Sequence, residues 1–155
     1  DNLLVIQTLS KSRALAGLRV GFAFGHKDLI EGLNRIKNSI NSYTIDRIAI
    51  SGAAEAIRDE EYFKEITKKI INTREKTVED LESLGFNVLE SKANFVFASH
   101  NRVPGKVIYE KLKDNGVLVR YFNKERIDNF LRTSIGTDEE MAVLIEKLKI
   151  ILGGN

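Results

Sequence analysis

The chain of 155 residues contains no cysteine, which excludes a disulfide framework, a catalytic thiolate and a cysteine-based zinc site. Its two histidines, His26 and His100, have no further histidine or acidic residue at the spacing of metal ligands. We expect both to be surface or helix-capping residues. No apolar run approaches the roughly 18 to 20 residues that a membrane-crossing helix needs. The sequence therefore predicts no metal centre and no membrane partner.

The chain also lacks a large excess of either positive or negative charge. The 24 basic and 22 acidic residues give a net charge of +2 and are mixed along the chain, without the basic stripe that nucleic acid requires. A glycine-rich phosphate loop is absent from these 155 residues. With 43% hydrophobic residues, the chain is large enough for a core of ordinary size. Nucleic acid is thus not a predicted partner.

Apolar spacing in the first half changes from strand-like to helical. Residues 3–7 and 20–24 are short apolar runs, typical of buried strands. A short helix is predicted around Leu29 to Ile36, and a second over residues 45–57. The acidic residues 59–61 are interpreted as the start of a longer helix, not as a general acid-base pair, and Gly85 as its end.

The second half reads strand, strand, helix, strand, strand, helix. The predicted strands are residues 86–89, 93–98, 117–119 and 130–135. A helix begins near Pro104, the only proline, and ends at Asn115-Gly116. Thr137 followed by Glu140 fits a capping box before a final helix with one apolar stripe. The pattern predicts an α/β fold with a mainly antiparallel sheet covered by helices.

The first predicted strand is followed by a segment rich in small residues with Lys11 and Arg19 eight positions apart. A free lysine amine is almost wholly protonated at neutral pH, so a nucleophilic lysine must be desolvated or already condensed with a carbonyl. The hydroxyls of Thr8 and Ser10 and the guanidinium fork of Arg19 match a dianionic ligand. The segment, predicted as a strand-end loop, thus offers a reactive amine beside a phosphate clamp.

The wording SKSRALAGLRVGFAFG, residues 10–25, resembles the lysine motif of the fold-type I pyridoxal-phosphate (PLP) aminotransferases, and most closely that of the histidinol-phosphate aminotransferases. The resemblance implies that Lys11 is the Schiff-base lysine. It also implies that Thr8, Ser10 and Arg19 bind the phosphate of the cofactor, pyridoxal 5'-phosphate.

Two later segments carry the same resemblance. LRTSIGT, residues 131–137, is similar to the segment whose arginine, here Arg132, binds the substrate carboxylate. GVLVR, residues 116–120, resembles the segment whose arginine, here Arg120, contacts the substrate phosphate. For Arg132 the alternative is a strand arginine paired with a surface carboxylate.

The activity implied is transamination in histidine biosynthesis by a cytoplasmic homodimer. Its substrates would be histidinol phosphate or imidazole acetol phosphate with glutamate and 2-oxoglutarate. The freed amine of Lys11 would act as general base and acid. Arg132 would bind the carboxylate of glutamate, and Arg120 with Arg132 the phosphate of the other substrate.

By the same resemblance, the chain is the C-terminal part of such an enzyme. Residues 1–45 would be a remnant of the PLP-binding large domain with the Schiff-base lysine, and residues 46–155 the connecting helices and the small domain. The other cofactor-binding groups would lie upstream, so we expect the isolated chain to be inactive. We also expect Leu3 to Ile6 to pair with another copy or to be poorly ordered.

Two other functions stay open. A phosphothreonine decarboxylase of the same fold has a similar lysine motif, and aminotransferase-like domains occur as ligand sensors in transcription regulators. The sequence also departs from the family at residues 41–46, NSYTID, which lack the proline and asparagine of the usual PYNVN-like stretch near the cofactor and dimer interface. The role of that stretch is therefore an open question.

Overall fold

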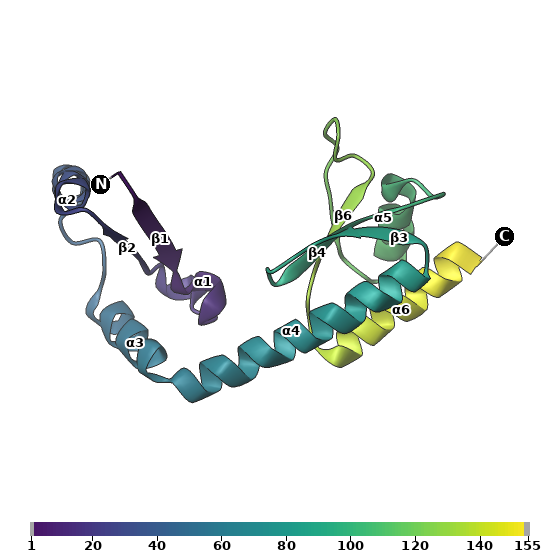
Figure 1. Cartoon of the computed structure of the whole chain (residues 1–155), viewed down its shortest axis with the longest axis horizontal. Coiled ribbons are helices and arrows are strands. Elements are labelled where there is room, and N and C mark those ends of the chain that lie inside the picture. The colour runs from purple at the N-terminus through teal and green to yellow at the C-terminus, as the bar shows by residue number, and fades with distance from the viewer. Residues whose placement is uncertain (1, 154–155) are drawn as a thin grey trace. The chain divides into compact units, whose positions relative to one another are not determined.

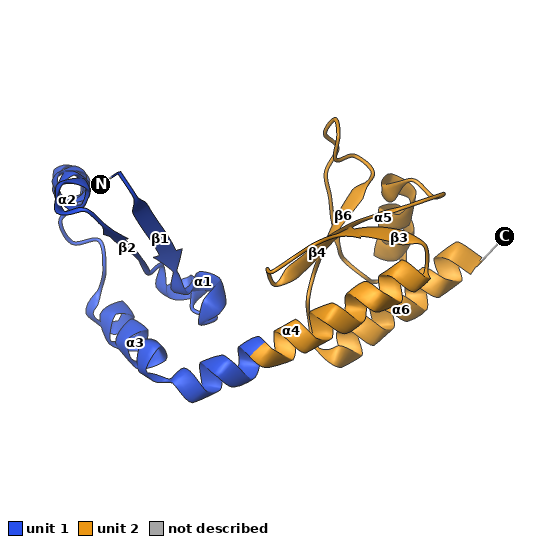
Figure 2. Ribbon diagram, in the orientation of Figure 1, with its two compact units in different colours: residues 1–67 blue, residues 68–155 orange. Residues whose placement is uncertain are grey.

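The computed structural model describes residues 2–153 and divides into two compact units, unit 1 (residues 1–67) and unit 2 (residues 68–155; Figure 2). The division lies within a helix of 24 residues, α4 (Glu60–Ser83). This is the helix that the sequence predicts as the connection between two domains. The domain boundary near residue 45 in a longer protein stays a prediction.

Unit 1 contains a two-stranded antiparallel sheet. β1 (Leu4–Thr8) pairs with β2 (Gly21–Gly25), with Leu4 opposite Gly25 and Thr8 opposite Gly21 (Figure 1). Between the strands lie a one-turn helix, α1 (Leu9–Ser12), and a 3-10 turn, η1 (Ala16–Leu18). Two helices follow, α2 (Lys27–Ile40) and α3 (Arg47–Arg58). The short helix predicted around Leu29 is thus a full 14-residue helix.

The two strands lie where the sequence predicts them, but the prediction that they are buried is wrong for this chain. Leu3 and Ile6 are 70% and 72% exposed. The expectation that Leu3 to Ile6 would be poorly ordered is not met, since β1 pairs with β2 of the same chain, while pairing with another copy stays a prediction. The physical reason is local: Leu9 N–H donates to the Val20 carbonyl at 3.1 Å, which closes the hairpin.

A small apolar cluster fixes the segment between β1 and β2. Leu9, Val20, Ala49 and Ala53 are buried. Leu18 lies so close to Gly52 on α3 that a Cβ atom added to this glycine would be 3.0 Å from Leu18 Cδ1. The alanines and the glycine let α3 pack closely, because larger side chains would push the helix away. The helix itself begins where the Asp46 carboxylate accepts a hydrogen bond from Ala49 N–H at 2.8 Å. The lysine segment is therefore packed against α3.

Unit 2 is a four-stranded antiparallel sheet with the order β3-β4-β6-β5. Its strands are β3 (Phe86–Leu89), β4 (Phe95–His100), β5 (Arg120–Tyr121) and β6 (Phe130–Ser134). The helices are α5 (Gly105–Asp114), α6 (Asp138–Gly153) and the second part of α4; α4 and α6 run side by side (Figure 1). This confirms the predicted α/β unit with an antiparallel sheet and helices.

One face of this sheet forms the core. Val96 and Ala98 on β4 and Leu131 on β6 are buried, and they alternate with residues that point to the other face. The helices contribute Leu81, Ile108, Leu112, Leu144, Leu148 and Ile151. The opposite face carries Phe95, Phe97, Phe130 and Arg132, none of which is fully buried. Helices thus cover one face only, and the aromatic side chains lie on the open face.

The predicted strand over residues 117–119 is wrong. Val117 N–H donates to the carbonyl of Leu112 at 2.9 Å, so the chain is still completing the end of α5, with Gly116 at a φ of +79°. Pairing with β6 starts only at Arg120. Val117 and Val119 nevertheless pack against the core, which explains their apolar pattern.

The burial of Arg74 in α4 was not predicted from the sequence. Arg74 is 7% exposed, donates from Nη1 to the carbonyl of Ala93 at 3.1 Å and lies 3.9 Å from the Glu75 carboxylate. A buried charge is tolerated when its donors are used in this way. The contact ties α4 to the segment that precedes β4.

His26 is a helix-capping residue, as predicted, whereas His100 is half-buried at the end of β4 and caps no helix, so the prediction is wrong for His100. His26 precedes α2, and its Nδ1 accepts a hydrogen bond from Asp28 N–H at 3.4 Å. His100 Nδ1 accepts from the N–H groups of Arg102 and Val103. Gly85, with a φ of +87°, follows the end of α4. Such features depend on hydrogen bonds and backbone geometry between residues close in sequence, so they can be predicted without knowing the tertiary fold.

The capping box before α6 is confirmed. Thr137 N–H donates to Glu140 Oε2 at 2.8 Å, and Glu140 N–H donates to Thr137 Oγ1 at 3.2 Å. Both bonds satisfy N–H groups that have no partner within the helix. Since α6 supplies four buried side chains, its first turn bears on the stability of the whole unit.

Thr137→Ala removes one bond of this box and should lower the free energy of unfolding by about 1 kcal/mol. Urea denaturation of the chain followed by circular dichroism measures the loss. Thr137→Ser keeps the hydroxyl and serves as the control, with a change of only a few tenths of a kcal/mol expected. Equal destabilisation by both variants would show that the capping hydroxyl does not contribute.

Candidate functional site

The lysine segment forms a helical turn, so the predicted strand-end loop is wrong in detail. Thr8 caps α1, where its Oγ1 accepts from Ser10 N–H at 3.1 Å and lies 2.9 Å from Ser10 Oγ. Ser12 Oγ donates to the carbonyl of Thr8 at 3.1 Å. Leu9 is buried beneath the turn, while Lys11 is exposed. Capping and packing together present the lysine on the outer side of a fixed turn.

The amine of Lys11 has no acidic partner. Within residues 2–153 no carboxylate lies within 4.0 Å of its Nζ. A lysine in a stable ion pair would have to break that pair before reacting. Lys11 is therefore available to a carbonyl compound that reaches this turn.

Arg19 adopts a left-handed backbone conformation at the end of the turn, with a φ of +54°. Its Nη1 donates to the carbonyl of Ala16 at 2.9 Å, and its side chain is exposed. A non-glycine residue in this conformation costs about 1 to 2 kcal/mol. Thr8, Ser10 and Arg19 thus supply two neighbouring hydroxyls and a guanidinium around one short turn, a donor set that suits a phosphate group.

Arg13 is a further residue of this turn that sequence reasoning did not single out. Its guanidinium lies 3.9 Å from the ring centroid of Phe63 and donates to the carbonyl of Asp59 at 3.0 Å and to Glu60 Oε1 at 3.3 Å. Hydrogen bonds from Lys64 and then from Arg13 hold the pKa of Glu60 below its usual value. Arg13 therefore ties the Lys11 turn to the first turns of α4, and only a structure shows it.

The two arginines predicted to bind substrate face each other in unit 2. Arg120 on β5 and Arg132 on β6 are directly opposite residues of an antiparallel pair. Opposite residues in such a pair have Cβ atoms about 4.5 to 5.5 Å apart, and two like charges there repel each other. Both side chains are exposed on the open face of the sheet.

Neither arginine is neutralised. Within the described part of the chain, no carboxylate lies within 4.0 Å of the guanidinium of Arg120 or Arg132. The alternative interpretation of Arg132, a strand arginine paired with a surface acid, is therefore not what the structure shows. Two adjacent guanidinium groups of this kind would suit an anion with two or more oxygens.

The structure thus groups the predicted residues in two sets. Thr8, Ser10, Lys11 and Arg19 lie around one turn of unit 1. Arg120 and Arg132 lie on neighbouring strands of unit 2. The first set presents an exposed amine beside two hydroxyls and a guanidinium, and the second presents two guanidinium groups with no carboxylate partner among the described residues.

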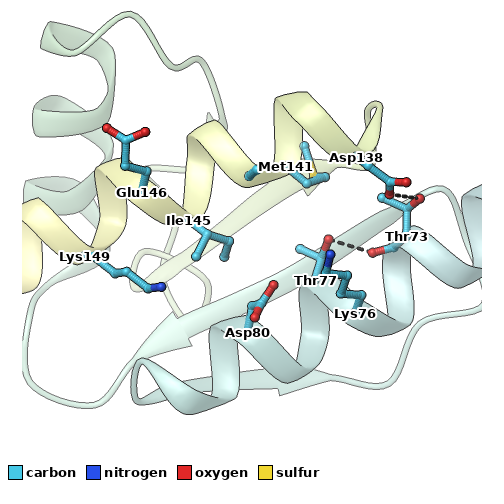
Figure 3. Close-up of a pocket in the computed structure, with 10 residues that line it drawn as sticks. Thr73, Lys76, Thr77, Asp80, Asp138, Met141, Ile145, Glu146 and Lys149 are labelled. Carbon is cyan, nitrogen blue, oxygen red and sulfur yellow. Dashed lines mark hydrogen bonds between the residues drawn. The ribbon is translucent and has the colours of Figure 1, made fainter.

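A hollow of about 270 Å³ between α4 and α6 contains none of these residues (Figure 3). At one end, Thr73 Oγ1 donates to Asp138 Oδ1 at 2.7 Å, and Thr77 Oγ1 donates to the carbonyl of Thr73. Charged residues of both signs line it: Lys76, Asp80, Glu146 and Lys149. The Thr73 hydroxyl links α4 to α6 and the Thr77 hydroxyl bonds within α4, so we interpret the hollow as part of the helix–helix contact.

Residues 2–153 contain no group of three histidine or acidic side chains placed to hold a metal ion. None of their helices is long and apolar enough to cross a membrane.

Comparison with known proteins gave relatives along the whole chain. A histidinol-phosphate aminotransferase of Clostridium beijerinckii is 74% identical over all 155 residues, which correspond to 43% of its own length. One from Clostridium botulinum is 62% identical over 97% of the chain and 43% of its length. The chain therefore spans less than half the length of these relatives.

Solved structures agree. The histidinol-phosphate aminotransferase of Sinorhizobium meliloti, determined in complex with pyridoxal-5'-phosphate, superposes with a TM-score of 0.86 and 27% identity. The match covers 99% of this chain and 42% of that one. The model of the family described as aminotransferase class I and II matches residues 1–148. The chain belongs to this aminotransferase family.

Proposed function

We propose that a protein built from this chain and the remaining part of the aminotransferase fold is a PLP-dependent histidinol-phosphate aminotransferase. It would transfer an amino group between histidinol phosphate and 2-oxoglutarate, with imidazole acetol phosphate and glutamate as the products. The names of the relatives that are 74% and 62% identical support this proposal. The observation that carries it is the unneutralised pair of Arg120 and Arg132.

The pair favours a phosphorylated substrate for a reason of charge. A carboxylate carries one negative charge and is satisfied by one bidentate guanidinium, whereas a phosphate monoester carries close to two charges and three terminal oxygens. Two arginines on opposite strand positions are costly unless such an anion is bound between them. Arg132 alone would bind the carboxylate of glutamate and 2-oxoglutarate, and both arginines the phosphate.

The residues of unit 1 fit the cofactor. Thr8 and Ser10 present adjacent hydroxyls and Arg19 an exposed guanidinium, which together suit the cofactor's phosphate. Lys11 would hold the cofactor covalently through Nζ. The bound cofactor supplies the electron sink for breaking the bond between the substrate's α-carbon and its hydrogen. The packed and capped turn keeps Lys11 in one place for this role.

Lys11 would also move the proton. Its amine would accept a proton from the α-carbon of the substrate as a general base and would later give a proton back as a general acid. Arg13 would keep the turn fixed during both steps through its contacts with Phe63 and Asp59. The cytoplasmic location and the homodimer implied by the resemblance remain predictions.

A phosphothreonine decarboxylase or a ligand-sensing domain would use the same lysine and arginines. The discriminating measurement is the product formed from histidinol phosphate and 2-oxoglutarate by the protein that contains this chain. Glutamate formation in step with histidinol-phosphate consumption supports the transaminase. Release of carbon dioxide from a phosphorylated amino acid, or tight binding without turnover, would contradict it.

Lys11→Ala in that protein should reduce transamination by several orders of magnitude, because the amine acts twice. Turnover of histidinol phosphate with 2-oxoglutarate measures the loss. Lys27→Ala, at the start of α2, is the matched control and should retain activity. Borohydride reduction of the cofactor-loaded protein followed by peptide mapping gives a second readout. A label on a lysine other than Lys11 would overturn the assignment.

Arg120→Gln should raise KM for histidinol phosphate by roughly ten- to a hundredfold, since a hydrogen bond to a charged group contributes about 1.5 to 3 kcal/mol. KM for glutamate should change much less, because Arg132 remains to bind its carboxylate. Arg132→Gln should raise both values. An equal response of the two substrates to Arg120→Gln would refute separate roles for the arginines.

The chain of 155 residues alone should show no measurable transamination, since it spans 43% of its relatives' length. A half-site open to water gains neither the positioning nor the electrostatic stabilisation on which catalysis depends. The test mixes the chain with pyridoxal phosphate, glutamate and a keto acid, and follows the product. Turnover near that of a complete enzyme would show that the additional length is not required.

A further inference from the structure

The two unneutralised arginines lie against aromatic rings. Phe122, which follows β5, has its ring centroid 5.5 Å from the guanidinium carbon of Arg120 and 6.0 Å from that of Arg132. Phe95 on β4 lies 5.5 Å from the guanidinium carbon of Arg132. Within the described residues, Phe122 is thus the one ring that contacts both cations. Its position makes it the shared support of the pair.

The ring of Phe122 is itself held in place. It meets Phe97 edge to face, with centroids 6.1 Å apart and an interplanar angle of 75°. Phe97 in turn stacks on Phe130, with centroids 4.7 Å apart and an angle of 18°. Aromatic pairs favour such edge-to-face and stacked arrangements. Phe122 therefore packs in an aromatic cluster with Phe97 and Phe130 on the open face of the sheet.

An aromatic support has a property that an acidic support lacks. A carboxylate would fix a guanidinium by occupying two of its N–H donors and cancelling its charge. A ring attracts the cation through its quadrupole, leaves the charge in place and keeps the donors in the guanidinium plane free. The contact also offsets part of the repulsion between two cations on opposite strand positions. Both arginines can then be ordered before an anion arrives.

We infer that Phe122 is a positioning residue that orients Arg120 and Arg132 together for a phosphate-bearing substrate. The inference rests on the proposed function for the identity of that substrate. The geometric part concerns only unit 2. Phe122 does not touch the anion: it acts through the two arginines, and its effect should appear in binding of the doubly charged group more than in the rate of the chemical step.

The kinetic test uses the protein that contains this chain with Phe122→Leu and Phe122→Tyr. Loss of two cation-π contacts at exposed sites predicts a rise in KM for histidinol phosphate of about five- to thirtyfold in Phe122→Leu. KM for glutamate should rise less than threefold, because Phe95 still supports Arg132. The kcat should stay within about twofold. Phe122→Tyr keeps the ring and should restore the wild-type KM.

Tyr121→Leu is the matched control. Tyr121 is the neighbouring aromatic residue and stacks on Tyr109 of α5, with centroids 5.6 Å apart, so it is held by other contacts than Phe122. Its replacement should lower stability without the selective rise in KM for the phosphorylated substrate. Equal kinetic effects of Tyr121→Leu and Phe122→Leu would mean that the loss is one of general packing and would overturn the inference.

A second measurement needs no turnover. In the 155-residue chain, the side-chain Nε–H signals of Arg120 and Arg132 are followed by NMR during titration with inorganic phosphate, with buried Arg74 as internal reference. Nuclear Overhauser effects should connect the ring protons of Phe122 with the Hδ protons of both arginines. In Phe122→Leu the dissociation constant for phosphate should rise about five- to thirtyfold.

The two measurements separate the possible failures. A wild-type protein that does not turn over histidinol phosphate contradicts the proposed function, while the phosphate titration still decides the role of Phe122. Turnover with an unchanged KM in Phe122→Leu overturns the inference alone. If Phe122→Leu does not fold, the Overhauser contacts of the wild-type chain decide, and their absence for either arginine overturns the inference.

Discussion

The register between β4 and β6 is the constraint on which unit 2 depends. Ala98 stands opposite Leu131 and Phe97 opposite Arg132, so one choice of register places the core residues on one face and the arginine on the other. A shift by one residue would bury the guanidinium against the helices and expose Leu131. Burial of the core thus also determines the side of the sheet on which the candidate anion site lies.

Unit 1 depends in a similar way on the packing of one short turn. Leu9 and Val20 are buried against the small residues of α3, and the hydrogen bond between their backbones closes the hairpin. Leu9 occupies the buried side of α1, and Lys11 lies on the exposed side. Apolar packing by residues without any chemistry therefore determines the side of the turn on which Lys11 lies.

Local signals of the sequence predicted most of the fold. Caps such as Thr137 with Glu140 and the glycine after α4 rely on hydrogen bonds between close neighbours, which a sequence reveals directly. The predictions from the sequence were wrong where tertiary contacts determine the backbone conformation or the burial of a residue. Val117 looks like a strand residue because it packs in the core, yet its backbone completes α5. Leu3 and Ile6 look like buried strand residues, yet within this chain they are exposed.

The residues of the candidate site also fall into two groups, those that sequence motifs reveal and those that only tertiary contacts reveal. Lys11, Arg19 and Arg132 belong to short motifs, so their positions could be predicted from a resemblance, and the structure adds that Arg132 has no acidic partner among residues 2–153. Arg13 and Phe122 belong to no such motif. Arg13 meets Phe63 about fifty residues away in sequence, and Phe122 meets Arg132 across a strand pair. Contacts of this kind follow from the tertiary fold.

Two residues around the lysine turn, Ala14 and Arg19, share a left-handed backbone with φ values of +55° and +54°, but only Arg19 carries a functional group. Glycine would relieve about 1 kcal/mol of strain at either position. At position 19 that gain would remove a guanidinium, whereas at position 14 it would remove a single methyl group. An engineer seeking a more heat-resistant variant should therefore choose Ala14→Gly and leave Arg19 strained, since at position 19 thermostability would be gained at the expense of the proposed anion binding.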